Sequence, residues 1–415
     1  MNDQRQPVAV IGAGIVGLCA ALYLQRAGEA VVIIDPRGPG EGASRGNASI
    51  MAVSSCVPVA TPGIARRVPG MLMDPLAPLA IRWAYLPRLA PWLWRFLEAS
   101  APARVEAISI ALRALLVEAI GAYQPLLAEA GLSDMLRRNG SLLVFESDAK
   151  FAATQPYLEL QRRRGIVMDI LAAEEIRQLE PSLAPIFRHA VFHRENGHVV
   201  DNFRLAQALA ADVVRRGGLI RQASARGFTF GPEGPTQVLT DSGAVDCRAV
   251  VVAAGAWSRT LVRQLGQDVP LDTERGYHVM LPQPGTMPRL PIFSAEGGCV
   301  ATPLEGGLRI AGTVELGGLD APPSPARLEV LLKRGRRLFG ALDDRGRSDW
   351  MGFRPSLPDS LPVIGRSLRH RNAWLAFGHG HVGLTLAAIT GRLVTALVAG
   401  REPGLDLTPY RPDRF

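Results

Sequence analysis

Short runs of apolar, β-branched residues recur along this chain. Residues 8–11 (VAVI), 30–34 (AVVII) and 249–252 (AVVV) are such runs, and an apolar stretch up to Leu24 follows the first. Strands of a parallel sheet are buried on both faces, so continuous apolar runs are typical of them, whereas the stretch before Leu24 suits a helix. The pattern predicts an α/β fold with a Rossmann-like parallel sheet.

Other segments alternate apolar and polar residues, which indicates strands with two different faces. Residues 274–280 (ERGYHVM) have this period of two. Segments of this kind predict a second, α+β domain, which is built on a mixed antiparallel sheet. Its strands are expected at residues 142–145, 276–281, 299–303 and 307–311.

Two helices are predicted from their ends and composition. Residues 201–217 read as a helix with Asp201 as N-cap and Gly217 near the C-cap, followed by a strand from Leu219. Residues 381–400 are apolar but contain Arg392 and follow glycine-rich turns. We expect a buried helix there rather than a membrane span.

The turn after the first strand carries a glycine motif. Gly12, Gly14 and Gly17 have G-x-G-x-x-G spacing, and Asp35 ends the second strand, 18 residues after Gly17. In such a unit the glycines allow a tight turn, a close approach to a pyrophosphate and close helix packing, while the acid binds a ribose. The motif predicts a dinucleotide site, with an empty Rossmann-like unit as the alternative; Ile15, Val16 and Pro36 belong to the same site.

The segment at residues 247–258 (CRAVVVAAGAWS) favours FAD over NAD as the dinucleotide. After its strand, Ala254 and Gly255 bring bare backbone close to the cofactor, and Trp257 follows. Two-domain flavoproteins commonly have such a strand, and nicotinamide domains have no particular need of one. The alternative is an ordinary core strand that ends in a glycine turn.

Charge and cysteine content exclude several classes of function. The formal net charge is +8, from 46 basic and 38 acidic residues, but no run of like charge is longer than residues 162–164. We therefore expect no nucleic-acid binding, although the charge weakly favours anionic partners. The four cysteines lie far apart and have no metal-ligand spacing, so we expect no metal site and a reducing compartment. The apolar stretch at residues 8–24 does not read as an export signal.

Taken together, these motifs resemble the D-amino-acid oxidase superfamily of flavoproteins, which includes glycine oxidase, sarcosine oxidase and, most similar, the D-amino-acid dehydrogenases. The resemblance covers nearly the whole chain. It depends on the glycine motif with Asp35 and on the segments GASRGNA, VVVAAGAWS, GLRIAGTVE, GFRPSLPDSLPVIG and GHGHVGLTLA, at residues 42–48, 250–258, 307–315, 352–365 and 378–387.

The resemblance implies where the flavin binds. In the family, the segment that matches GASRGNA runs along the flavin, and a helix N-terminus points at the flavin pyrimidine, where negative charge develops on reduction. Many relatives have glycine where this chain has Ser49. No cysteine precedes Arg354, so non-covalent FAD is implied. The residues expected around the isoalloxazine are Ser44, Asn47, Ala48, Gly380, Val382, Gly383, Leu384 and Thr385.

The resemblance also implies the catalytic residues. Arg354 matches the family arginine that makes a bidentate contact with the substrate carboxylate. A planar guanidinium has the geometry for such a contact. His381 stands where glycine oxidase has another arginine, and we expect it to look into the pocket. Val300 replaces a family tyrosine, so Tyr277 is the candidate second anchor. Arg275 and His278 are further candidates on the same strand, and His379 is expected to fix the turn.

The implied enzyme is an FAD-dependent D-amino-acid dehydrogenase or oxidase. Hydride transfer from Cα to flavin N5 gives an imino acid, which water hydrolyses to a 2-oxo acid, and the substrate is a D-amino acid or a related amine. The alternatives are the FAD subunit of a hydroxyproline- or opine-type dehydrogenase and an enzyme of modified tRNA. A quinone or a partner protein is a candidate electron acceptor.

One site built from distant segments requires a discontinuous FAD-binding domain. We expect it at residues 1–60, 196–258 and 345–415, and the substrate-binding domain at 61–195 and 259–344. Residues 75–97 mix tryptophans, prolines and arginines. This segment either covers the active site, which we favour, or touches a membrane. We expect a cytoplasmic protein. The alternative is a protein that contacts the inner face of the cytoplasmic membrane peripherally.

Overall fold

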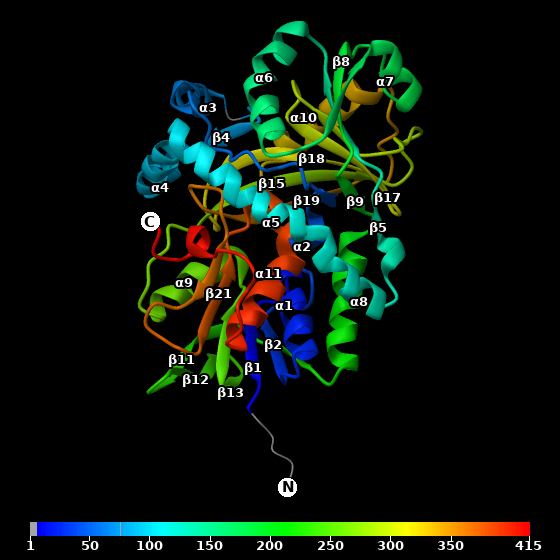
Figure 1. Ribbon diagram of the computed structural model, residues 1–415. Coiled ribbons are helices and arrows are strands. Elements are labelled where there is room, and N and C mark those ends of the chain that lie inside the picture. The colour runs from blue at the N-terminus through cyan, green and yellow to red at the C-terminus, as the bar shows by residue number, and fades with distance from the viewer. Residues whose placement is uncertain (1–5, 75) are drawn as a thin grey trace.

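A computed structural model describes residues 6–74 and 76–415 and places two main sheets one above the other (Figure 1). The first, here the parallel sheet, has the strand order β10-β2-β1-β14-β21-β20. Its neighbouring strands run parallel, except that β20 is antiparallel to β21. This confirms the predicted Rossmann-like unit. The strands are β1 (Val8–Ile11), β2 (Val31–Asp35), β10 (Leu219–Gln222), β14 (Ala249–Val252), β20 (Val363–Arg366) and β21 (Ala373–Phe377).

Both faces of the parallel sheet are buried, as its apolar runs require. Val8 and Val10 of β1 belong to one core with helices α1, α5, α8 and α11. Ala9 and Ile11 belong to a second core, formed with β11, β12, β13 and α9. The covering elements are α1 (Ile15–Arg26), α5 (Pro102–Glu129), α8 (Asn202–Arg215), α9 (Ser258–Gln264), α11 (Gly383–Val398), β11 (Ala225–Gly231), β12 (Gly234–Thr240) and β13 (Gly243–Asp246).

The second sheet, here the mixed sheet, has the order β19-β15-β18-β17-β16-β6-β8-β7, and β4 also pairs with β18. Its pairs are antiparallel except β16 with β6 and β18 with β4, so the predicted mixed antiparallel sheet is confirmed. The strands are β4 (Leu79–Ile81), β6 (Ser141–Phe145), β7 (Met168–Ala172), β8 (His189–His193), β15 (Asp272–Leu281), β16 (Ile292–Ser294), β17 (Cys299–Leu304), β18 (Gly307–Leu316) and β19 (Ser348–Ser356).

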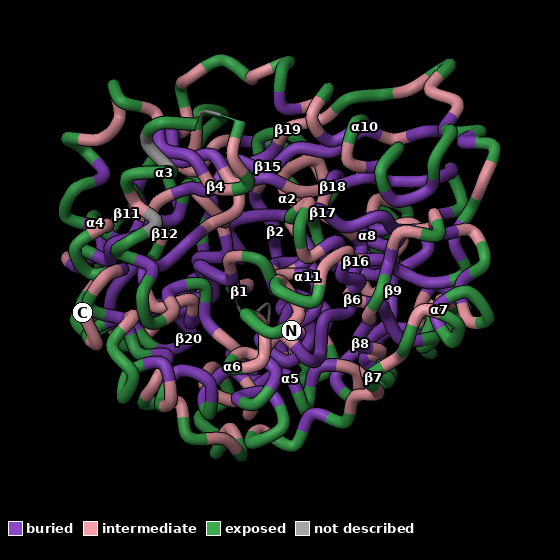
Figure 2. Tube along the Cα trace, turned by 90° about the horizontal axis from the view of Figure 1, so that it is seen from above, coloured by how far each residue is buried: buried purple, intermediate pink, exposed green. Residues whose placement is uncertain are grey.

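Helices complete the upper half of the molecule. Helix α10 (Pro325–Phe339) packs on β15 and β18, while α3 (Val68–Met73) and α4 (Leu86–Ala99) lie beside β4. Helices α6 (Asp148–Arg163) and α7 (Ala173–Leu179) lie at the other end of the sheet. A small sheet of β3 (Ile50–Met51), β9 (Gly197–Val199) and β5 (Leu136–Arg137) joins the two halves. Figure 2 shows buried strands inside and exposed segments at the rim.

The sheet pairing changes one detail of the expected division into domains. Strand β19 lies within residues 345–415, which were expected in the FAD-binding domain, yet it pairs along its length with β15 of the mixed sheet. Its hydrogen-bonding partner, rather than its position in the chain, decides where it lies. Helix α5 lies within residues 61–195, which were expected in the substrate-binding domain, yet it packs on α11 and belongs to the core of the parallel sheet. The remaining boundaries stay a prediction.

The predicted helices form at the expected places. The Asp201 carboxylate accepts hydrogen bonds from the backbone N–H groups of Phe203 and Arg204, at 2.9 and 3.0 Å, and caps α8. Gly217 follows the helix with φ +83°. The segment Gly380–Val398 is long and apolar enough to cross a membrane, but 67% of its most apolar window is buried inside the protein. It is a core helix, packed on α1 and α5.

Candidate active site

A cavity of about 1070 Å³ extends from the carboxyl ends of β1 and β2 to the mixed sheet. Its wall includes the glycine turn, residues 42–48, the end of β14, parts of β15 and β19, and the start of α11. Ligands bind at the carboxyl ends of strands in open α/β sheets, which is the location found here. The wall contains most predicted cofactor residues: Gly12, Gly14, Ile15, Val16, Asp35, Pro36, Ser44, Asn47, Ala48, Ala254, Gly255, Trp257, Gly380, Gly383 and Leu384.

The glycine turn has the geometry that a dinucleotide requires. Gly12 has φ +112°, and a Cβ there would collide with the carbonyl of Ala253. A Cβ at Gly17 would collide with the carbonyl of Gly12, so Gly17 serves helix packing and does not line the cavity. At Gly14 the nearest atom to an added Cβ is Ser44 Oγ, at 3.4 Å. That side of Gly14 is therefore open for a phosphate to approach the backbone.

Asp35 is held at the end of β2 by two backbone groups. Its Oδ2 accepts from the Ala13 N–H and its Oδ1 from the Arg37 N–H, both at 2.9 Å. Each carboxylate oxygen has a further lone pair for a ribose hydroxyl. The Arg37 guanidinium lies over the Trp257 ring, 4.7 Å from its centre, and also lines the cavity. Sequence reasoning missed Arg37; the available signal was its place two residues after the acid.

The loop expected along the flavin is fixed by polar contacts from both halves of the molecule. Ser44 Oγ accepts from the Ile15 N–H at 2.9 Å. Arg309 Nη1 donates to the Asn47 carbonyl at 2.7 Å, and Thr302 Oγ1 donates to the Ala48 carbonyl at 2.9 Å. Ser49 has φ +59°, the left-handed conformation that glycine adopts most readily.

His278, a candidate substrate contact, instead supports this loop. Its Nδ1 donates to the Gly46 carbonyl at 2.8 Å, and its ring stacks on Trp350 with 5.2 Å between centres. Burial lowers the pKa of His278 to about 3, so the imidazole is neutral at physiological pH. It is not part of the cavity wall.

The turn at residues 380–382 and the first residues of α11 bring Gly380, His381, Gly383 and Leu384 to the cavity. Val382 packs in the core. The hydroxyl of Thr385 accepts from the Ala52 N–H at 3.0 Å and donates to the Ile50 carbonyl at 3.3 Å. Both residues were predicted to bind cofactor, but neither lies in the wall. His379 bonds Thr390 Oγ1 at 2.9 Å and thereby fixes the turn, as expected.

Arg354 lies in the cavity wall, in the space over Gly276. The β15–β19 register places Gly276 opposite Gly352, and a Cβ at Gly276 would collide with the Arg354 guanidinium. Arg354 Nη1 donates to the Thr313 carbonyl at 3.1 Å. A guanidinium has five N–H donors, so donors remain for a ligand. Burial lowers the pKa of Arg354, while nearby Glu274 opposes the change, and the side chain stays cationic.

Glu274 is a functional candidate that sequence reasoning missed. It lies opposite Arg354 in the register, lines the cavity and is buried. Ser356 Oγ donates to its Oε1 at 2.6 Å, and His381 Nε2 contacts its Oε2. Burial alone would raise the pKa of Glu274, but His381, Ser356 and Arg354 outweigh it and hold the pKa below the usual range. The carboxylate is therefore ionised at neutral pH.

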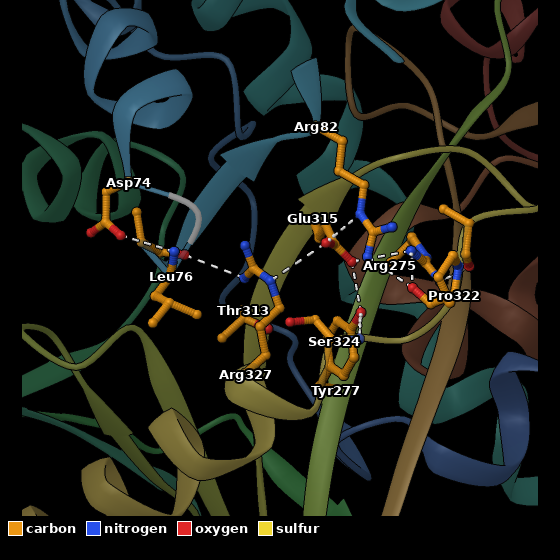
Figure 3. A network of polar contacts seen from close by, with 12 residues as sticks. Asp74, Leu76, Arg82, Arg275, Tyr277, Thr313, Glu315, Pro322, Ser324 and Arg327 are labelled. Atoms are coloured by element: carbon orange, nitrogen blue, oxygen red, sulfur yellow. Dashed lines mark hydrogen bonds and ion pairs between the residues drawn. The ribbon is translucent and has the colours of Figure 1, made fainter. Parts of the chain in front are cut away.

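Tyr277 and Arg275 point away from Arg354, which corrects their expected role. Alternation along β15 puts them on the face opposite Glu274. Tyr277 Oη donates to Glu315 Oε2 at 2.6 Å, and Arg275 Nη1 pairs with the same oxygen at 3.2 Å (Figure 3). Arg82 Nε donates to Glu315 Oε1 at 2.7 Å. Tyr277 belongs to the cavity wall, but its hydroxyl serves this buried network and not the side that holds Arg354.

Residues 76–97 cover one end of the cavity, in agreement with the favoured expectation. Leu79 and Ile81 of β4 line the wall together with Trp92, Leu93 and Phe96 of α4. Leu316 of β18 pairs with Ile81 on one side and with Glu274 on the other. Across the strands of the mixed sheet, the charged pair Arg354 and Glu274 is thus followed by the apolar pair Leu316 and Ile81. Val300, which replaces a family tyrosine, is also in the wall.

Residues 7–397 match the DAO family, described as FAD dependent oxidoreductase. The chain belongs to this family. It is 42% identical, over 98% of each chain, to a protein from Bradyrhizobium diazoefficiens named D-amino-acid oxidase. It is 31% identical, again over 98% of each, to a D-amino acid dehydrogenase of Paramagnetospirillum magneticum. A glycine oxidase structure from Geobacillus kaustophilus superposes with TM-score 0.76 at 23% identity, covering 99% of both chains, which supports the DAO fold.

The cofactor of the DAO family fits the observed cavity. The open side of Gly14 and the N-terminus of α1 suit the pyrophosphate of FAD, and the fixed Asp35 carboxylate suits its ribose. Residues 46–48 and the first turn of α11 line the stretch between that end and Arg354, where a flavin ring would lie. No group of three His, Cys, Asp or Glu among the described residues is placed to hold a metal ion.

Proposed function

We propose that this protein catalyses the oxidative deamination of a D-amino acid to a 2-oxo acid. The observation that carries the proposal is Arg354, a cavity-lining guanidinium seated over Gly276 with N–H donors left for a carboxylate. The two named relatives, an oxidase and a dehydrogenase of D-amino acids, support the choice of substrate. They do not favour a subunit of an opine- or hydroxyproline-type dehydrogenase.

When bound, FAD supplies the acceptor for the hydride that leaves Cα. The protein's own residues bind and orient the substrate. Arg354 fixes the carboxylate in position and direction, and so fixes the direction of the Cα–H bond. The N-terminus of α11 places backbone N–H groups where negative charge develops. The apolar wall of Trp92, Leu93 and Phe96 excludes water from the reacting atoms.

The wall formed by β4 and α4 supports a substrate with a bulky apolar side chain. With the carboxylate at Arg354, the row Glu274, Leu316 and Ile81 continues along the mixed sheet. A side chain that extends in this direction meets leucine, isoleucine and aromatic carbon rather than polar groups. D-Leucine, D-methionine and D-phenylalanine fit this surface better than D-aspartate.

The experiment is anaerobic bleaching of the FAD absorbance by a panel of amines. The panel contains D-alanine, D-leucine, D-methionine, D-phenylalanine, D-aspartate, their L-enantiomers, D-proline, sarcosine and glycine. We expect reduction by the D-amino acids with apolar side chains and none by the L-enantiomers. Reduction by L-amino acids or sarcosine alone would contradict the proposal.

We also propose that a quinone or partner protein accepts the electrons and that the protein contacts the inner face of the cytoplasmic membrane peripherally. The supporting observation is the outer side of residues 76–97, where Trp83 and Trp94 are 61% and 67% exposed and Arg88 and Arg95 are also exposed. Tryptophan with arginine suits a bilayer interface. Sedimentation with anionic vesicles, lost in W83A/W94A, is expected; equal sedimentation of both proteins would contradict it.

A further inference from the structure

We propose that His381, oriented by Glu274, accepts a proton from the substrate's ammonium group, so that the neutral amine is the form that is oxidised. This inference depends on the proposed function. An ammonium group keeps its proton at neutral pH, as the lysine side chain does with a pKa of about 10.4. Its nitrogen has no lone pair to support hydride loss from the neighbouring Cα. A base at the substrate end of the cavity therefore has a definite task.

Most titratable groups in the cavity wall cannot be this base. Arg354 is always protonated. Asp35 lies at the opposite, dinucleotide end, and the Tyr277 hydroxyl is bonded to Glu315. Burial raises the pKa of the Cys299 thiol to about 12. His379 is buried and bonded to Thr390.

Glu274 and His381 remain at the substrate end, and their contacts assign different roles to them. Both Glu274 oxygens have partners, Ser356 Oγ on Oε1 and His381 Nε2 on Oε2. Glu274 is therefore the residue that positions the imidazole. A carboxylate that accepts from Nε2–H selects the tautomer whose Nδ1 carries the lone pair. The His381 side chain is 43% exposed and lines the cavity, and its Nδ1 has no hydrogen-bond partner among the described residues.

The groups around His381 come from two strands. Glu274 on β15 bonds it, Arg354 on β19 lines the same cavity, and Ser356 on β19 is uncharged. His379, on the same turn, is directed to Thr390 instead. Glu274 pairs with His381 and Arg354 donates to Thr313, so the guanidinium charge remains for the substrate carboxylate.

The step moves one proton and no electrons. The N–H bond of the ammonium breaks, its electron pair stays on nitrogen, and a new N–H bond forms at Nδ1 of His381. The free pair on nitrogen can then form the C=N bond when the hydride leaves Cα. The imidazolium returns its proton to solvent.

The test compares the holoenzyme with H381Q and E274Q. Glutamine at 381 can still donate to Glu274 but has no basic nitrogen. We expect kcat/KM for a reactive D-amino acid at pH 7 to fall about 100-fold in H381Q, the low end of the range for general bases. The deficit should shrink as the pH rises towards 10, because a growing share of the substrate amine is then neutral. The surface variant H189Q is the matched control, because His189 also pairs with a carboxylate, Asp148, at 2.8 Å outside the cavity.

A second readout does not depend on turnover. ¹⁵N NMR of the histidine side chains should show neutral His381 with its proton on Nε2, and the share of this tautomer should fall in E274Q. Retained FAD absorbance and an unchanged melting temperature establish that each variant is folded. A constant deficit in H381Q from pH 6 to pH 10 would overturn the inference and leave the deaminase function intact. A wild-type protein that no amino acid reduces, even at pH 10, would overturn both.

Discussion

Arg354 occupies the space that a side chain at position 276 would fill, and this explains why a glycine interrupts β15 there. The register sets Glu274 opposite Arg354 and Gly276 opposite Gly352, so the guanidinium crosses bare backbone before it reaches Thr313. A cation fixed in this way loses little freedom when it binds a carboxylate. The position of the guanidinium therefore depends on Gly276, whereas Gly352 makes room for the Trp350 ring.

The change R354M tests this directly. It removes the two-pronged contact while keeping an apolar side chain of similar length, so FAD should still bind. We expect kcat/KM for D-amino acids to fall about 30- to 1,000-fold. This corresponds to a loss of roughly 2 to 4 kcal/mol of transition-state stabilisation. Stopped-flow flavin reduction measures it. The control is R366M, at an exposed position on β20; equal kinetics in R354M and wild type would rule out the carboxylate assignment.

Strand β15 shows how one element serves two sites. On one face of β15, Glu274 lines the cavity and His278 bonds the loop at residues 42–48. On the other face, Arg275 and Tyr277 bond Glu315. The period of two was readable in the sequence, but which face meets the substrate was not, because it depends on the pairing of β15 with β19 across 80 residues. Tyr277 was therefore assigned to the wrong face, and Glu274 was overlooked.

Helix α4 is the element that decides the space for the substrate side chain. Leu93 lines the cavity and is half-buried, whereas Leu97, one turn later, is half-buried outside the cavity wall. We expect L93A to lower kcat/KM for D-leucine and D-phenylalanine about tenfold, since apolar contact of a few methylenes contributes 1 to 3 kcal/mol. D-Alanine should be affected little.

The matched control for this prediction is L97A, which removes the same atoms from the same helix. It should leave the ratio of D-phenylalanine to D-alanine kcat/KM unchanged. Steady-state kinetics on both substrates measure the ratio. A parallel loss for both substrates in L93A would mean that Leu93 maintains the helix rather than the side-chain pocket.

At the scale of the whole molecule, buried neutral histidines make stability depend on pH. Burial lowers the pKa of His193 and His198 to about 4, and of His278 and His379 to about 3. An unfolded histidine titrates near 6.5. Below that pH the unfolded chain takes up protons that the folded chain does not, so the free energy of unfolding falls as pH drops from about 6.5 towards 4.

Urea unfolding of the apoprotein between pH 7.5 and 4.5 measures this effect. In H193Q about one proton fewer should be taken up on unfolding, because one buried histidine is gone. The slope of the free energy of unfolding against pH should be smaller accordingly, even if the variant is less stable at every pH. Identical slopes in H193Q and wild type would contradict the assignment of a neutral His193.

The sequence by itself determined the parts of the protein that depend on local geometry. The strand–turn–helix at residues 8–24, the acid at Asp35 and the Asp201 cap formed as expected, since strand and helix periods, the left-handed φ of Gly12 and capping act within a few residues. The motifs around Arg354 and residues 378–387 also indicated the DAO family and FAD.

Only the tertiary structure decided which side chains meet at the substrate. Glu274, Arg354 and His381 come together because β15 pairs with β19, and because the turn at residues 380–382 packs against β19 and contacts Glu274 through His381. These contacts join residues 80 and 107 positions apart. No local preference encodes such a register; it is set when the cores on both faces of the sheets are filled, and that packing places a carboxylate and an imidazole beside the arginine.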